Sequence, residues 1–464
     1  AHRGPDAAGY YNDSVVSLGH RRLSIIDLSD KGTQPIYNED KSKVIVFNGE
    51  IYNYKEIKNV LLQKGHKFRT ETDTEVILHG YEEYGTKLFE KLRGMFAFVI
   101  YDKEKNELVG ARDHFGIKPL YYYKEKDNFM FASEIKAFLA HPDFKKEVNK
   151  KALKMYLIFQ YSVFEETFFK NVFKLKPGHY FIYKNNKLEI KEFFNIDFKK
   201  SKKSFNSLKK ELQNILEDSI KYHQMTSDVE VGSYLSGGVD SSYVVSVAKP
   251  DKTFSVGFSE AGFDETEYAK ELSKMLKIKN YQKHISSDDF FNALPIVQYH
   301  TDEPHANLST VPLYFLSELA RKQVKVVLSG EGSDEMFAGY NEYNEPTILK
   351  IYRYVPLFIR QFIAFVARQF PHFPGQNTLK LYGKPIEERY IGHGSLFEEK
   401  EINKVLCDDL KDDMKIRDVL KPYYDKVKGK NEITKKMYID MFFWLPQDIL
   451  LKADKMTMAN SIEL

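Results

Sequence analysis

Residues 236–242 read Ser-Gly-Gly-Val-Asp-Ser-Ser and lie between an apolar run ending at Leu235 and a second run from Tyr243 to Ala248. The first run has the character of a buried strand and the second that of a helix. Two glycines in the connection permit the backbone of a tight loop, and a helix begins with the positive end of its dipole. The stretch therefore predicts a strand–loop–helix unit whose loop can hold an anion.

The pattern around this stretch is a regular alternation of strands and helices. It predicts strands at 253–258, 281–285 and 324–328, and helices at 207–222, 265–276, 288–299 and 311–322. Such a succession is typical of an α/β doubly wound parallel sheet, whose ligands lie beyond the carboxyl ends of the strands. From about residue 345 the chain becomes helical and rich in aromatic residues.

A second glycine-rich segment, Ser329-Gly330-Glu331-Gly332-Ser333-Asp334-Glu335, follows the apolar run Val326-Val327-Leu328. Two glycine-rich strand ends that each carry a carboxylate can face one metal–polyphosphate from two sides. A phosphate alone would repel Asp240, whereas Mg²⁺ between them would make Asp240 a ligand. The alternative for Asp240 is a helix cap. The first loop taken alone does not decide between the two, and the second loop favours the metal.

The N-terminal part shows a different pattern. Short strand-like runs at 44–47, 96–101, 108–111, 120–123 and 129–132, one helix from Thr74 to Tyr84, and a hairpin around Asn185-Asn186 predict an α+β sandwich with antiparallel sheets. The lysine-rich segment 198–204 is interpreted as a linker. It divides the chain into domains at 1–198 and 205–464.

Bulk composition narrows the function. A chain of 464 residues is too long for one ordinary hydrophobic core, so two or more domains are expected. The 69 basic residues nearly balance the 66 acidic ones, which argues against a nucleic-acid binder. No apolar run has the length of a membrane span. The single cysteine, Cys407, excludes an intrachain disulfide and fits a reducing cytoplasm. We expect Cys407 to be a buried apolar residue.

These motifs closely resemble those of the glutamine-hydrolysing asparagine synthetase family. The resemblance extends over nearly the whole chain and includes segments 2–6, 22–27, 47–53, 72–77, 94–98, 112–120 and 445–456. It implies an N-terminal-nucleophile glutaminase joined to an ATP-pyrophosphatase domain. Glutamine-derived ammonia would then amidate a carboxylate that ATP has adenylated, with release of AMP and pyrophosphate.

In the glutaminase part, the resemblance implies that the Asn48 amide and the Gly49 N–H form an oxyanion hole. Arg22 would pair with the glutamine α-carboxylate. Glu50 and Asp73 would hold the α-ammonium group and the side-chain amide of glutamine. Without the resemblance, Asn48-Gly49 would be interpreted as a hairpin turn and Asp73 as a helix cap.

In the synthetase part, the resemblance assigns ATP contacts to Leu235, Ser236, Gly237, Gly238, Asp240, Ser241, Ser242, Val256, Ser329 and Gly330. It places Glu331 at the acyl-adenylate step, and Asp240 and Asp334 are the expected Mg²⁺ ligands. Segment 302–307 is a candidate lining of the acceptor pocket, although a proline-bounded loop explains it almost as well.

Family members begin with a catalytic cysteine, and this chain begins at Ala1, so we expect a partial chain at both ends. The predicted substrates are glutamine, ATP and a carboxylate acceptor, most simply aspartate, and a homodimer is compatible with the pattern. Two alternatives remain open. The same architecture can amidate another acid, such as a cell-envelope sugar acid, or close a lactam. The glutaminase half can also be a degenerate interaction domain.

Overall fold

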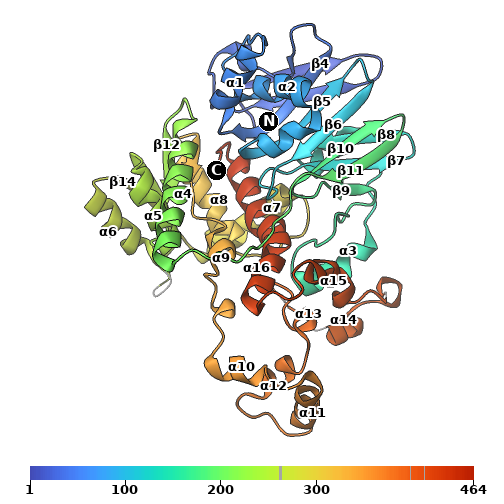
Figure 1. Cartoon of the computed structure of the whole chain (residues 1–464), viewed down its shortest axis with the longest axis vertical. Helices are drawn as coiled ribbons and strands as arrows, with labels where there is room; N and C mark the ends of the chain where they lie inside the picture. The colour runs from blue at the N-terminus through green and yellow to red at the C-terminus, as the bar shows by residue number, and fades with distance from the viewer. Residues whose placement is uncertain (261–263, 395, 398, 412) are drawn as a thin grey trace. The chain divides into compact units, whose positions relative to one another are not determined.

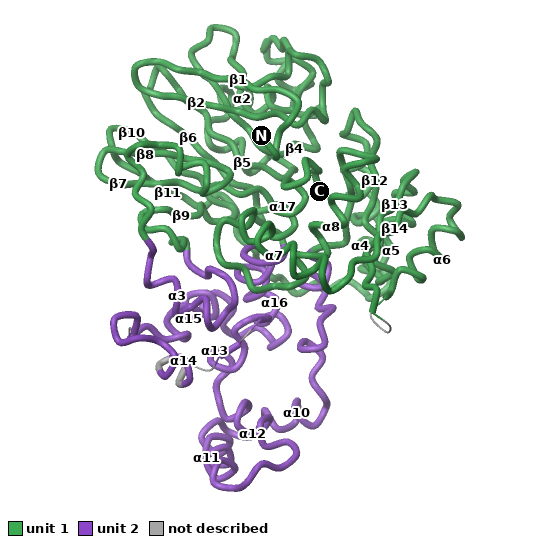
Figure 2. The backbone as a smooth tube through the Cα atoms, turned by 180° about the vertical axis from the view of Figure 1, so that it is seen from behind, with its two compact units in different colours: residues 1–147, 165–331, 450–464 green, residues 148–164, 332–449 purple. Residues whose placement is uncertain are grey.

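The structure, a computed structural model, describes residues 1–260, 264–394, 396–397, 399–411 and 413–464. It divides into two compact units (Figure 2). Unit 1 contains Ala1–Glu147, Glu165–Glu331 and Leu450–Leu464, and unit 2 contains Val148–Phe164 and Gly332–Ile449. Within these described ranges, none of the helices combines the length and apolar character that crossing a membrane requires.

The first part of unit 1 is built on a six-stranded antiparallel sheet of order β11-β10-β6-β5-β4-β3 (Figure 1). Its strands are β3 (Ile36–Tyr37), β4 (Lys43–Ile51), β5 (Gly94–Asp102), β6 (Glu107–Arg112), β10 (His179–Lys184) and β11 (Lys187–Glu192). The predicted strands at 44–47, 96–101 and 108–111 are therefore confirmed. Asn185 and Asn186 both have positive φ, as the two central residues of a tight hairpin turn require, so that prediction is confirmed too.

Both faces of the sheet are buried at its central strands β4 and β5, along which successive side chains point to opposite faces. Phe47 of β4 and Phe98 of β5 belong to the core that contains the helices α1 (Tyr54–Gln63) and α2 (Asp73–Tyr84). Val46 and Val99 belong to the opposite core. A second layer supplies that core with side chains from β1 (Ala7–Asn12), β2 (Ser17–Arg22) and β8 (Asn128–Ala132). Its strands β7 (Tyr121–Glu125) and β9 (Val172–Lys174) contribute to a further cluster beside it. The predicted sandwich is thus present.

The second part of unit 1 is a four-stranded parallel sheet of order β14-β13-β12-β15. The strands are β12 (Val231–Tyr234), β13 (Lys252–Phe258), β14 (Lys279–Ile285) and β15 (Val326–Leu328). The helices are α4 (Phe205–Met225), α5 (Val239–Ala248), α6 (Thr266–Leu276), α7 (Ser287–Thr301), α8 (Thr310–Arg321) and α17 (Leu450–Ala459).

Helices cover both faces of this parallel sheet. Leu235 packs with residues of α5 and α6, whereas the preceding Tyr234 packs with residues of α7, α8 and α17. Neighbouring side chains therefore enter opposite cores, which confirms the predicted doubly wound arrangement.

Unit 2 is helical, as expected from residue 345 onward. Its helices are α3 (Lys150–Phe159), α9 (Ser333–Phe337), α10 (Thr347–Tyr352), α11 (Leu357–Ala367), α12 (Gln376–Tyr382), α13 (Ile386–Arg389), α14 (Glu399–Val405), α15 (Ile416–Lys426) and α16 (Glu432–Phe442). Aromatic and aliphatic residues such as Phe159, Tyr390 and Phe443 form its core.

The expectation of a buried Cys407 is wrong. Cys407 is exposed and sits at the start of a short 3₁₀ helix, η5 (Asp408–Leu410). The preceding Leu406 fills the core position instead. A cysteine in a polar connection between helices therefore follows its local sequence rather than the general preference of its residue type for burial.

Candidate active site

The N-terminal sandwich contains a cavity of about 390 Å³. Its walls come from β2, β4, the start of α2 and the segment after β8. All five predicted residues of the glutaminase part line it, namely Arg22, Asn48, Gly49, Glu50 and Asp73. The fold thus brings together side chains that were selected from three separate sequence motifs.

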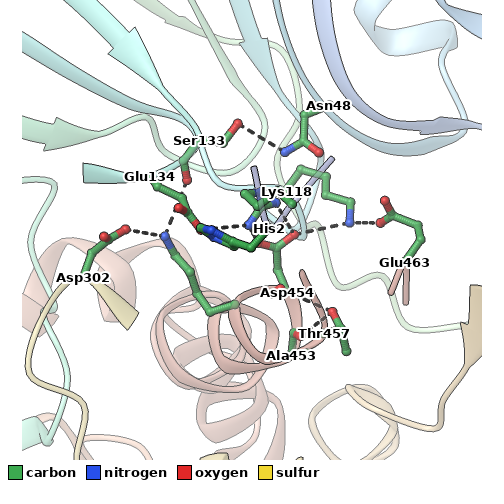
Figure 3. Close-up of polar contacts among 12 residues, drawn as sticks. His2, Asn48, Lys118, Ser133, Glu134, Asp302, Ala453, Asp454, Thr457 and Glu463 are labelled. Carbon is green, nitrogen blue, oxygen red and sulfur yellow. Dashed lines mark hydrogen bonds and ion pairs between the residues drawn. The ribbon is translucent and has the colours of Figure 1, made fainter. Parts of the chain in front are cut away.

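Asn48 and Gly49 lie inside strand β4, opposite Ala97 and Phe96 of β5. The hairpin-turn interpretation of this pair is therefore wrong, because the apolar strand continues through it to Ile51. Gly49 has a φ of 141°, and a Cβ there would meet the Met95 carbonyl oxygen at 2.0 Å. Only glycine fits this backbone. The Asn48 amide donates a long hydrogen bond of 3.4 Å to Ser133 Oγ, from the segment after β8 (Figure 3).

Two buried carboxylates, Glu50 and Asp73, line the same cavity. Burial, and then the negative charges of Glu463 and Asp73, raise the pKa of Glu50 well above its ordinary value. Its Oε1 has no hydrogen-bond partner among the described residues. Burial raises the pKa of Asp73 to about 7 against the hydrogen bonds that its oxygens accept, among them one of 2.8 Å from the Ile51 N–H. A cationic ligand would stabilise the ionised form of both buried carboxyl groups.

The helix-cap interpretation of Asp73 is wrong as well. The N-cap residue of α2 is Thr72, and Asp73 is the first residue of the helix. Its side chain instead ties that end of the helix to β4 through the Ile51 bond.

Arg22 is held rigidly at the edge of the cavity. Its guanidinium donates to the carbonyl oxygens of Ser29 at 2.7 Å and Ile26 at 3.1 Å, and also to that of Asp27. Burial lowers the pKa of Arg22, and nearby acids oppose that effect. A preorganised guanidinium of this kind is suited to a carboxylate ligand.

A buried ion network that the sequence did not predict connects this sandwich to α17 (Figure 3). Arg3 forms two hydrogen bonds with Asp454, at 2.7 and 3.0 Å. Lys118 lies 3.3 Å from Asp454 and also contacts Glu463. The next residue of α17, Lys455, extends the network, because its Nζ lies 2.6 Å from Asp302.

The segments that supply this network carry the family resemblance. Arg3, Lys118, Asp454 and Lys455 all lie in these segments, at 2–6, 112–120 and 445–456. No local pattern shows that residues so far apart in sequence form pairs, because ion pairing depends on tertiary structure.

The loop at 236–242 lies at the point where the parallel sheet reverses its strand order. β12 is followed through α5 by β13 on one side, and β15 lies on its other side. Ligands of open α/β sheets bind in the crevice at such a switch point, beyond the carboxyl ends of the strands. The two predicted loops follow β12 and β15, so they begin at adjacent strand ends.

The two loops are in close contact. A Cβ at Gly330 would lie 2.9 Å from both Asp240 Cβ and the Ser241 backbone nitrogen. Gly330 is therefore needed for the second loop to reach the first turn of α5. Gly237 has a φ of 88°, which also favours glycine.

Hydrogen bonds within the first loop preorganise its hydroxyl groups. Ser236 Oγ and Ser241 Oγ are 3.0 Å apart, and the Gly238 N–H donates to Ser236 Oγ at 3.3 Å. Gly238 is the N-cap residue of α5 and Asp240 is the second residue of the helix, so the helix-cap interpretation of Asp240 is wrong. Hydroxyls, glycine N–H groups and a helix N-terminus fit a polyphosphate, and the Asp240 carboxylate fits the Mg²⁺ that would accompany it.

The remaining predicted residues of the nucleotide site are placed as follows. Leu235 is buried directly after β12, and its N–H donates to the Phe254 carbonyl of β13 at 2.9 Å. Val256 is half-buried on β13, next to Ser255. Ser329 Oγ accepts from the Glu331 N–H at 3.3 Å. Asp334 belongs to unit 2, at the second position of α9.

Comparison with known proteins identifies the relatives of this chain. Residues 1–194 match the glutamine amidotransferase domain family, and residues 211–464 match the asparagine synthase family. The chain is 45% identical over 470 residues to asparagine synthetase (glutamine-hydrolyzing) 1 of Bacillus subtilis, with 100% of this chain and 74% of that protein covered. The chain belongs to the glutamine-hydrolysing asparagine synthetase family.

Other members of this asparagine synthetase family are also similar. A putative asparagine synthetase of Mycobacterium tuberculosis is 37% identical over 485 residues, which cover 100% of this chain and 74% of that protein. A second putative enzyme, from Methanocaldococcus jannaschii, is 37% identical over 387 residues, which cover 77% of this chain and 74% of that protein. The resemblance inferred from the motifs is thereby confirmed.

In this chain, the candidate acceptor segment 302–307 makes contacts with other parts of the structure. Asp302 accepts from Lys455 Nζ at 2.6 Å and from the Ile135 backbone N–H at 3.0 Å. The Phe168 N–H donates to Glu303 at 2.8 Å. These two acids therefore connect the parallel-sheet part to the sandwich, and their role towards an acceptor remains a prediction.

Proposed function

We propose that this protein is a glutamine-hydrolysing asparagine synthetase that converts aspartate, ATP and glutamine-derived ammonia to asparagine, AMP and pyrophosphate. The observation that carries the proposal is the coexistence, in one compact unit, of two sites. One is a cavity with two desolvated carboxylates and a fixed guanidinium. The other is a pair of glycine-rich loops in contact at the switch point of a parallel sheet. The family match over the whole chain supports it.

In the cavity, we assign the two ends of glutamine to separate groups. The guanidinium of Arg22 binds the α-carboxylate. Glu50 and Asp73 bind the α-ammonium and the side-chain amide, because these buried carboxylates need positive or donor partners. During hydrolysis, the amide oxygen becomes negative and is stabilised by the Asn48 amide and the Gly49 N–H.

At the sheet edge, we assign the pyrophosphate portion of ATP to residues 236–242, with Leu235, Val256, Ser329 and Gly330 around the nucleoside and α-phosphate. Glu331 is assigned to the acyl-adenylate step. Asp240 and Asp334 would hold Mg²⁺, which when bound neutralises the polyphosphate and allows a carboxylate beside it. The helix dipole of α5 and the loop N–H groups bind the leaving pyrophosphate.

The proposal includes the division into a glutaminase domain, 1–198, and a synthetase domain, 205–464, and a cytoplasmic location supported by the single cysteine. A homodimer is the assembly to be tested by light scattering. The likeness of the whole chain to about three quarters of proteins named asparagine synthetase favours aspartate over a sugar acid or a lactam precursor. The cavity with its charged lining favours a working glutaminase over a degenerate interaction domain.

The test is an acceptor screen with purified protein, ATP, Mg²⁺ and ammonium chloride, in which pyrophosphate release is followed. We expect release with aspartate that depends on ATP, together with equimolar AMP and asparagine. Pyrophosphate release with another carboxylic acid, and none with aspartate, would overturn the assignment of the acceptor.

A further inference from the structure

We propose that a divalent transition metal, most simply Zn²⁺, binds at the outer side of the sandwich between Glu39, His66, His79 and Glu82. This site is separate from both sites described above and does not depend on the proposed function. One potential ligand atom from each of the four side chains lies within 4.8 Å of the others. The ligands come from three segments, namely the turn before β4, the loop after α1, and α2 itself.

The separations of the ligand atoms are close to those of a tetrahedral metal site. His79 Nδ1 lies 3.1 Å from Glu82 Oε2 and 3.3 Å from Glu39 Oε2. His66 Nδ1 lies 3.9 Å from Glu82 Oε2 and 3.9 Å from Glu39 Oε1. Zn–N and Zn–O bonds of about 2.0–2.2 Å place tetrahedral ligand atoms about 3.3–3.6 Å apart. Small side-chain rotations would therefore complete the coordination.

Each ligand also has a second interaction that fixes its orientation, as metal ligands in proteins typically do. The other imidazole nitrogen of His79 faces Glu75 Oε1 at 3.4 Å, and that of His66 faces Glu83 Oε2 at 3.6 Å. Glu82 Oε1 accepts from the Asn38 amide at 2.7 Å, which directs Oε2 to the cluster. Glu39 Oε1 accepts from the Lys67 N–H at 2.9 Å.

The carboxylate behind His79 is itself anchored. Glu75 accepts from the Arg69 N–H at 2.9 Å and from the Thr70 N–H and Thr70 Oγ1 at 2.8 and 2.7 Å. The His79 side chain is completely buried, and that of His66 is 16% exposed, while Glu39 at 35% leaves an approach for an ion. A histidine held between a fixed carboxylate and two further acids is arranged as a metal ligand with a carboxylate behind it.

The ligand set indicates which metal is bound. Two imidazole nitrogens and two carboxylate oxygens suit Zn²⁺ and its first-row neighbours, whereas Mg²⁺ and Ca²⁺ prefer oxygen ligands alone. The metal competes with protons. Binding should therefore be measured at pH 8 rather than in acid.

The metal would join three segments, namely α2, the loop after α1 and the turn before β4. α2 carries His79 and Glu82 in its later turns and begins at Asp73, which lines the cavity. Fixing α2 to the turn at Glu39 and the loop at His66 would stabilise the helical layer over the six-stranded sheet. We therefore assign the metal a structural role.

The experiment uses the purified 464-residue chain without a polyhistidine tag, stripped with a chelator and titrated with ZnCl₂ against a chromophoric competitor at pH 8. We expect one Zn²⁺ per chain with submicromolar affinity, unaffected by millimolar Mg²⁺, and a rise of the melting temperature by a few degrees in excess Zn²⁺. His66→Ala and Glu39→Gln should each weaken binding at least tenfold. Both side chains are partly exposed, so the variants should fold, and circular dichroism checks this.

The matched control is His141→Ala, which removes an exposed imidazole of the same unit that lies outside the cluster. It should bind Zn²⁺ like the parent. Co²⁺ added in place of Zn²⁺ should give the intense visible bands of tetrahedral cobalt, and His66→Ala should lose them. The proposal fails if the parent binds no Zn²⁺ below 10 μM, an order of magnitude weaker than expected of a structural site, or if folded His66→Ala and His141→Ala bind equally. In either case the cluster is a set of histidine–carboxylate contacts without a metal.

Discussion

Arg3 and Asp454 lie 451 residues apart in the sequence and form a two-bond ion pair, with Nη1 donating to Oδ2 at 2.7 Å and Nη2 to Oδ1 at 3.0 Å. Asp454 also receives Lys118 Nζ at 3.3 Å. The pair joins the first residues of the sandwich to α17, which packs against the parallel sheet. It is one of the points at which the two halves of unit 1 depend on each other.

Asp454→Asn should destabilise the protein strongly, because it leaves two buried cations with less compensation. Breaking one partner of a buried pair costs about 3–5 kcal/mol, and the midpoint of urea unfolding measures it. The control is Asp218→Asn, which removes an exposed ion pair with Arg93 of similar length, 2.9 Å, and should cost at most about 1 kcal/mol. Equal losses of unfolding free energy in the two variants would show that the buried pair stabilises the protein no more than the exposed pair does.

Asn48→Ala in the full-length protein should slow glutamine hydrolysis by about 10²–10³-fold, as loss of an oxyanion donor does elsewhere. Synthesis from free ammonia should remain nearly intact, because the proposal assigns different steps to the cavity and to the sheet edge. Glutamate release and ammonia-dependent pyrophosphate release are measured in parallel. Asn12→Ala, on an exposed position of β1, is the control and should change neither. If both activities fall together in Asn48→Ala, the residue has a structural role in β4.

The pH dependence of glutamine use by the full-length protein should show the titration of Asp73. Burial raises the pKa of this carboxyl to about 7, so the free protein carries it ionised only above that pH. A ligand with an ammonium or amide donor needs the ionised form, and kcat/KM reports the pKa values of the free enzyme. We expect kcat/KM for glutamine to fall up to about tenfold per pH unit below pH 7.

Asp73→Asn separates this titration from that of Glu50 and from that of the nucleophile. It should weaken glutamine use at every pH and remove the inflection near pH 7. A wild-type profile that is flat between pH 5.5 and 8, or an unchanged inflection in Asp73→Asn, would show that Asp73 does not titrate in the cavity.

Much of the fold could be predicted because short apolar runs have a direct physical cause. The runs 44–47 and 96–101 are apolar at every position, since both faces of β4 and β5 are buried there, and the glycine-rich ends of two apolar runs lie beside each other after β12 and β15. Local sequence does not determine strand order. That β15 lies beside β12 follows from the packing of α7, α8 and α17, which no single segment specifies.

The interpretations that failed were local ones. Asn-Gly is a strong turn signal, but at Asn48-Gly49 the pairing with β5 continues through it. Aspartate is a good N-cap residue. However, Thr72, directly before Asp73, caps α2, and Gly238, two residues before Asp240, caps α5. Tertiary contacts overrode propensity in each case. The cluster around His79 was invisible in the sequence because its ligands come from three segments.

The last prediction concerns Asp240, the one carboxylate of the 236–242 loop. It is the second residue of α5 and the cap position belongs to Gly238, so Asp240→Asn removes a charge without removing a cap. The variant keeps the shape of the side chain. Loss of an acid from a first helical turn costs only about 0.3–1 kcal/mol, so the fold should be retained. If Asp240 holds Mg²⁺ against a polyphosphate, acceptor-dependent pyrophosphate release should nevertheless disappear.

The matched control is Asp288→Asn, because Asp288 is likewise the second residue of its helix, α7, and is exposed. It should have the same small effect on stability and none on activity, so any difference between the two variants reflects the site rather than the helix dipole. Asp334→Asn should abolish pyrophosphate release as Asp240→Asn does if both carboxylates hold the metal–nucleotide. Glutamine hydrolysis serves as the internal reference for folding. Normal synthetase activity of Asp240→Asn at limiting Mg²⁺ would remove the metal from the proposal and leave Asp240 the role of a charge at a helix N-terminus.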